Sequence, residues 1–126
     1  MKKITITIII FLFLCACTKE EVTSRAYPRV LTTEVANITT TGASFHGEIT
    51  FSSTEIVSHG FIWSTFSSMA IGYGNNIALG QKTGTGNFET SLQSSLVKGV
   101  KYYVLAYAQS SNYTVYGNVV EFELPK

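Results

Sequence analysis

The stretch LVKGVKYYVLAYA, Leu96–Ala108, decides the fold of this chain. Its glycine indicates a turn, and the apolar residues that follow alternate between two faces, as they do in a β-strand. Tyr102 and Val104 share one face, and Tyr103 and Tyr107 share the other. The stretch therefore predicts a turn followed by a strand on which the rest of the chain pairs and packs.

A leucine, a glycine turn and then a tyrosine are typical of the tyrosine corner of immunoglobulin-type sandwiches. In that corner the tyrosine hydroxyl bonds to the backbone just upstream and holds the crossover between two sheets. The pattern assigns this structural role to Tyr102. We therefore expect an all-β, immunoglobulin-like or fibronectin type III-like sandwich of about seven strands.

Composition narrows the function classes. The chain has 126 residues, which favours one domain, and its formal net charge is +1. It has no basic patch of the kind that nucleic acid requires, so we expect no nucleic-acid partner. All acidic residues are glutamates, which removes the usual aspartate ligands of calcium loops.

The N-terminus has the pattern of a targeting segment. Lys2 and Lys3 precede an apolar run, Ile4–Leu14, that is shorter than the ~20 residues a transmembrane helix needs. The run ends in Leu14-Cys15-Ala16-Cys17, which resembles the lipobox of bacterial lipoproteins. The resemblance implies cleavage before Cys17 and a lipid on that cysteine, because Leu14 is too large for the position before the cleavage site. An ordinary secretory signal with an incidental cysteine is the alternative.

These features divide the chain into three parts: a signal peptide at 1–16, a polar tether at 17–27 and the sandwich domain at 28–126. Several acyl chains on Cys17 would hold the protein on a membrane, at about 0.8 kcal/mol per buried methylene. Thr18 is not the aspartate that retains lipoproteins in the inner membrane, so we expect the outer membrane. Lys19-Glu20-Glu21 resembles a short surface-export signal, and the choice between the periplasmic and the outer face stays open.

Alternating residues predict the remaining strands. We expect strands at Pro28–Val35, Gly42–Phe51, Ile56–Ser64, Asn87–Leu92 and Val115–Leu124. One more short strand is expected inside 65–82. Apolar residues occupy both faces of Ile56–Ser64, which predicts a strand covered on both sides. Whether Phe61 and Trp63 or Ile62 faces the sandwich core stays open.

The domain resembles the fibronectin type III-like domains of Bacteroidetes surface lipoproteins. The order and spacing of several short motifs carry the resemblance: ITTTGA at 38–43, GFIWS at 60–64, GTGNF at 84–88, YYVLAYA at 102–108 and Tyr116-Gly117 with Phe122. Val100, Leu105 and Asn112-Tyr113 depart from the family pattern. The resemblance implies a spacer or interaction module, and fold alone does not determine function.

The residues favour no enzyme and no cofactor. His46 and His59 have no cysteine or aspartate beside them, fewer ligands than zinc requires, and both are expected to be solvent-facing. Glu121 and Glu123 are neighbours on one strand face about 6.5–7 Å apart, which is typical of a solvated strand. The glycine pairs at 72–74 and 84–86 are turns, because neither opens a helix.

Tyrosines are the one candidate binding surface. If Tyr102 faces the core, Tyr103 and Tyr107 face outward, and Tyr113 lies in the turn that follows. Exposed aromatic rings can stack on sugars or anchor a protein partner. Residues of the strand Ile56–Ser64 or of the segment 65–82 could instead cover these tyrosines.

Three functions follow, and the partner itself, protein or glycan, stays open. The first is a non-catalytic interaction or structural module, lipid-anchored in the envelope. The second is a carbohydrate-binding surface lipoprotein that uses exposed tyrosines. The third is an assembly subunit that pairs through its first or last strand.

Overall fold

The computed structural model describes residues 28–125, and every regular element in that range is a β-strand. The strands are β1 (Arg29–Thr39), β2 (Gly42–Phe51), β3 (Ile56–Ser64), β4 (Asn75–Lys82), β5 (Gly86–Gln93), β6 (Tyr102–Gln109), β7 (Thr114–Tyr116) and β8 (Val120–Phe122). The all-β prediction is confirmed. The proposed signal peptide and tether, with Cys17, lie outside the described residues.

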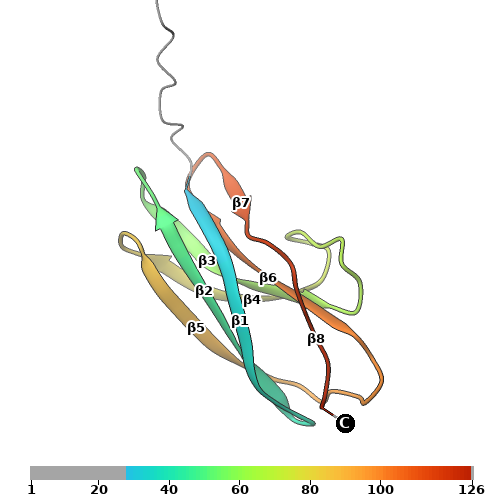
Figure 1. The fold of residues 1–126 in the computed structure, drawn as a ribbon. Coiled ribbons are helices and arrows are strands. Elements are labelled where there is room, and N and C mark those ends of the chain that lie inside the picture. Colours follow the sequence, from blue (N-terminus) through green and yellow to red (C-terminus); the bar gives the residue numbers. More distant parts are fainter. Residues whose placement is uncertain (1–27, 126) are drawn as a thin grey trace, which may run out of the picture.

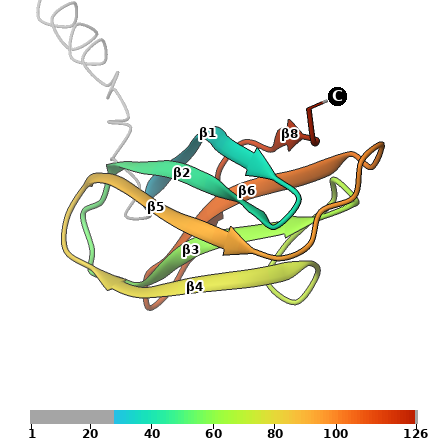
Figure 2. The ribbon, with the colours of Figure 1, turned by 90° about the horizontal axis from the view of Figure 1, so that it is seen from below.

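Two antiparallel sheets pack face to face (Figures 1 and 2). One sheet has the order β1-β2-β5. The other has the order β4-β3-β6-β7, with β8 also paired to β6. The chain enters β1 at one end of the sandwich, and its C-terminal end lies at the other (Figure 1).

Aromatic side chains fill the space between the sheets. Phe45 of β2 contacts Phe61 of β3 at 5.6 Å between ring centroids and Phe122 of β8 at 5.5 Å. The row continues from Phe61 to Phe88 at 5.1 Å, and from Phe122 to Tyr102 at 5.5 Å. Because these rings come from both sheets, their burial holds the two layers together.

Strand β3 is covered on both faces, as its sequence predicts. Phe61 lies in the main core, and Trp63, on the same side, packs against Tyr102 at 6.2 Å. Ile62 points the opposite way and is fully buried in a second apolar cluster. The alternative that the sequence left open is therefore settled in favour of Phe61 and Trp63.

The Tyr102 hydroxyl accepts a hydrogen bond from the Val97 backbone N–H at 2.9 Å. This bond spans the turn that precedes β6 and has the geometry of a tyrosine corner. Leu96, just before Val97, is buried in the main core. The turn is thus anchored by a polar and an apolar contact at once.

Three predicted strands differ clearly from the observed ones, and β5 is one residue longer at each end than the predicted Asn87–Leu92. β1 continues to Thr39 instead of ending at Val35, and β4 is a full eight-residue strand rather than a short one. The expected single strand Val115–Leu124 is divided into β7 and β8. The reason for the division is a contact between Asn118 and Thr32.

Asn118 leaves the β6 edge and bonds the backbone of β1. The Thr32 N–H donates to Asn118 Oδ1 at 2.9 Å, and Asn118 Nδ2 donates to the Thr32 carbonyl at 3.0 Å. The Thr32 hydroxyl also accepts from the Ala106 N–H at 2.8 Å. A side-chain amide thus takes the place of a neighbouring strand at Thr32 and closes this side of the sandwich.

We expect Asn118→Ala to lower the free energy of unfolding by about 1–3 kcal/mol, because two hydrogen bonds of ~0.5–1.5 kcal/mol each are lost. Urea denaturation measures the change. Asn112→Ala, in the exposed turn between β6 and β7, is the matched control and should stay within ~0.5 kcal/mol of wild type. Equal losses in the two variants would contradict this role of Asn118.

Candidate functional site

The structure corrects the predicted tyrosine surface at Tyr107. The side chain does lie on the outer face of β6, but only 1% of its surface is exposed. It packs with Ile62, Met69 and Leu105 in the second apolar cluster, and Tyr103 is half-buried against the same cluster. Because a buried ring offers no face to a ligand, Tyr107 is a core residue.

The cover over these tyrosines is the segment 65–74 between β3 and β4. Met69 is the buried residue of this segment, and Ala70 and Tyr73 form a tight turn through two backbone hydrogen bonds of 3.1 and 2.7 Å. Gly72 allows the turn with a φ of +95°. In the sequence, the one hint of this cover is an isolated Met69 within a polar stretch.

Other tyrosines remain accessible. Tyr113 is exposed in the turn after β6, as expected, and its N–H donates to Ser110 Oγ at 3.2 Å. Tyr116 of β7 is 40% exposed, and its hydroxyl accepts from the Ile71 N–H at 3.2 Å. Tyr73, in the same turn as Ile71, is 70% exposed. The accessible aromatic surface therefore includes Tyr73 and Tyr116, which the sequence did not single out together.

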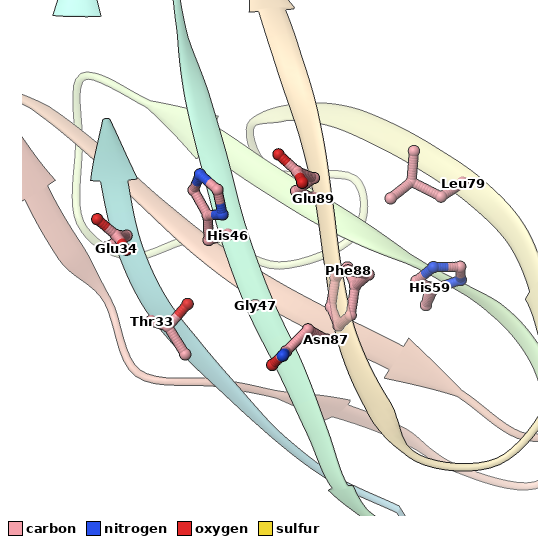
Figure 3. Close-up of a pocket in the computed structure, with 9 residues that line it drawn as sticks. All are labelled: Thr33, Glu34, His46, Gly47, His59, Leu79, Asn87, Phe88 and Glu89. Atoms are coloured by element: carbon pink, nitrogen blue, oxygen red, sulfur yellow. The ribbon is translucent and has the colours of Figure 1, made fainter. Parts of the chain in front are cut away.

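A groove of about 740 Å³ runs along the β1-β2-β5 sheet (Figure 3). Glu34, His46 and Glu89 lie on three neighbouring strands in the figure. Glu34 is opposite His46 in the β1–β2 ladder, and His46 is opposite Glu89 in the β2–β5 ladder, so all three share one face. His59 and Leu79 line the groove from the other sheet.

His59 is buried, and the prediction that it faces solvent is wrong. Its Nδ1–H donates to the Gly80 carbonyl at 2.7 Å, and its ring lies edge-on to Phe88 at 4.8 Å between centroids. Burial lowers the pKa of His59 below 6.5; the Gly80 hydrogen bond acts in the opposite direction, and nearby Lys82 lowers it further. His59 is thus a neutral structural residue near pH 7.

The lowered pKa of His59 makes the fold less stable in acid. Below about pH 6.5 the unfolded chain takes up a proton at His59 that the folded chain resists, so stability falls as pH falls toward the folded-state pKa. We expect the free energy of unfolding of the wild type to decrease between pH 7.5 and 5.5. His59→Gln should show a smaller decrease over that range in urea denaturation. A variant with the same slope as the wild type would contradict the assignment.

Residues 28–125 contain no group of three or more His, Cys, Asp or Glu side chains that could hold a metal ion. The same residues contain no helix long and apolar enough to cross a membrane.

Glu121 projects from β8 and forms an exposed salt bridge with Lys101 at 3.4 Å, and Glu123 is exposed. Two candidate sites therefore lie in the described residues. One is the half-buried His46 between Glu34 and Glu89. The other is the accessible aromatic surface with Tyr73 and Tyr116.

The class defined by this geometry is an all-β, two-sheet sandwich domain with a buried aromatic core. No protein-family model, curated protein or solved structure matches the chain.

Proposed function

We propose that this protein is a lipid-anchored component of a Gram-negative envelope, and that its fibronectin type III-like domain is a non-catalytic interaction or structural module. The observation that carries the proposal is the sequence Leu14-Cys15-Ala16-Cys17, which ends an apolar run and precedes a polar tether and one sandwich domain. A lipid on Cys17 would tie the domain to the outer membrane.

The domain itself supports the role of a module. Its strands divide between two sheets that are joined by a continuous aromatic core, and the Tyr102 hydroxyl holds the turn into β6. The part of the polar tether that follows Cys17, residues 18–27, would span at most ~35 Å when extended, which is enough to lift the sandwich clear of lipid head groups. A small rigid domain on such a tether is suited to contact a partner near the membrane.

Labelling with radioactive palmitate tests the anchor. Cells that express the full chain should incorporate label into it, Cys17→Ala should remove the label, and Cys15→Ala should leave it. These two cysteines are the only ones in the sequence and are two residues apart, which makes them a matched pair. Label that survives Cys17→Ala would refute the proposed attachment site.

Carbohydrate binding is the second candidate function, and the observation that favours it is the pair Tyr73 and Tyr116. Both rings are exposed, and the Ile71–Tyr116 hydrogen bond joins the turn that carries Tyr73 to β7. Exposed aromatic faces of this kind stack on sugar rings. A glycan array with the wild type and with Tyr73→Ala tests this function: binding that the substitution abolishes supports it, and an array without binding rejects it.

A further inference from the structure

The sandwich has four sheet edges, and they differ in how well they resist another strand. An edge strand exposes unpaired N–H and C=O groups, and proteins protect such edges with bulges, short strands, lysine, proline or a covering segment. The β1 edge is protected, because Asn118 takes both backbone groups of Thr32 and the β1–β2 ladder has three register shifts. The first strand, which the sequence suggested as a pairing site, is therefore blocked near its middle.

Two further edges are irregular. β7 and β8 are three residues each and are separated at 117–119, where the chain turns toward β1. β4 pairs with β3 through two register shifts, has Gly80 at a φ of +86°, and ends at Lys82. Each of these features disturbs the regular ladder that an added strand would need.

Among the described residues, the β5 edge has no bulge, lysine, proline or covering side chain, and its one backbone irregularity lies at its first residue, Gly86, with a φ of +128°. Its eight residues pair with β2 in one unbroken register, and within the described strands β2 is its only ladder partner. The strand contains no proline, lysine or arginine, and Glu89 is its one charge. Figure 2 shows β5 at the side of its sheet, with its other edge facing away from β2. A long, regular and nearly uncharged edge is the surface of this domain best suited to strand addition.

We propose that a second copy of this chain pairs antiparallel with β5, in a two-fold symmetric register centred on Thr90. Two-fold pairing brings the same strand of each copy together, so β5 must be complementary to itself. In a register centred on Glu89, two carboxylates would lie opposite each other, which is destabilising. In the register centred on Thr90, Glu89 lies opposite Ser91, and no like charges are opposed.

The Thr90-centred register is favourable on both faces of the sheet. On the core side Phe88 of one copy lies opposite Leu92 of the other, which extends the apolar layer. On the outer side Asn87 lies opposite Gln93, so amide meets amide. The two three-stranded sheets then form one continuous sheet across the dimer.

The proposed dimer rests on the function proposed above, because it gives the interaction module a partner and a surface. It does not depend on the lipid, so palmitate labelling can fail without affecting the test of the dimer.

Disulfide trapping in the full chain tests the register. Two strands paired antiparallel place opposite Cα atoms 4.5–5.5 Å apart, within the range that a disulfide bridges. Thr90→Cys should therefore yield a covalent dimer of twice the monomer mass when whole cells that express the chain are oxidised with copper phenanthroline. Asn87→Cys is the matched control on the same strand: its counterpart lies six residues away in this register, about 20 Å. Cells that express the wild type, oxidised in the same way, report any background from Cys15 and Cys17.

A double variant, Asn87→Cys with Gln93→Cys, should also crosslink, because the two cysteines face each other across the proposed pair. Protease resistance of each variant shows whether it folds, and the double variant decides the outcome if Thr90→Cys does not fold. Dimer in Thr90→Cys and in the double variant, without dimer in Asn87→Cys alone, supports the proposal. It is overturned by folded variants that stay monomeric, by equal crosslinking of Asn87→Cys, or by crosslinks to another protein only.

Discussion

Tyr107→Ala is expected to lower the free energy of unfolding by about 3–5 kcal/mol, the range found when a large buried aromatic side chain is removed. The Tyr107 ring is 1% exposed and packs under Met69, so its removal leaves a cavity that the cluster with Ile62 and Leu105 closes only in part. Because whole domains are stable by 5–15 kcal/mol, this one substitution takes a large share of the total. Urea denaturation measures the loss.

Tyr116→Ala is the matched control for Tyr107→Ala. The two tyrosines lie opposite each other in the β6–β7 ladder, but Tyr116 is 40% exposed and makes one side-chain hydrogen bond, to the Ile71 N–H. We expect it to cost about 1 kcal/mol or less. If Tyr107→Ala were as mild as Tyr116→Ala, the segment 65–74 would not cover β6 as described, and Tyr107 would return as a candidate binding residue.

Phe45→Ala is expected to have a similar cost, about 3–5 kcal/mol, for a different reason. Phe45 is fully buried on β2 and contacts Phe61 and Phe122, which belong to the other sheet. Removal of Phe45 therefore weakens the packing between the two sheets, whereas removal of Tyr107 weakens the packing of the segment 65–74 on the outer face of β6. The loss should appear as a lower urea midpoint in circular dichroism of the full chain.

Phe66→Ala is the matched control for Phe45→Ala, because 47% of the Phe66 side chain is exposed in the segment after β3. We expect a change within about 0.5 kcal/mol. Comparable losses in the two phenylalanine variants would mean that Phe45 does not join the sheets.

The sequence predicts best the elements whose apolar residues are bounded by turn residues on both sides. β2 and β3 have the predicted bounds, because each has a clear pattern of apolar residues and a turn on either side. Ile62 and Phe61 are both apolar, so periodicity alone could not decide which one faces the main core. That choice depends on which cover, a sheet or the segment 65–74, lies on each side.

The features that the sequence did not predict depend on distant contacts. The break between β7 and β8 follows from the bonds of Asn118 to Thr32, which is 86 residues away in the chain. His59 is polar and sits on a strand, yet it is buried, because the Gly80 carbonyl satisfies its ring and Phe88 packs beside it. Tyr107 is likewise buried, on the outer face of β6, because Met69 from the segment 65–74 packs against it. Local patterns contain none of these partners.

The most direct test of the proposed anchored module is the mass of its N-terminal peptide. The full chain is expressed in a Gram-negative host, extracted from the membrane with detergent and digested, and the first peptide is analysed by mass spectrometry. We predict a chain that begins at Cys17 and carries fatty acyl groups on that residue. A peptide that begins elsewhere, or an unmodified Cys17, would contradict it.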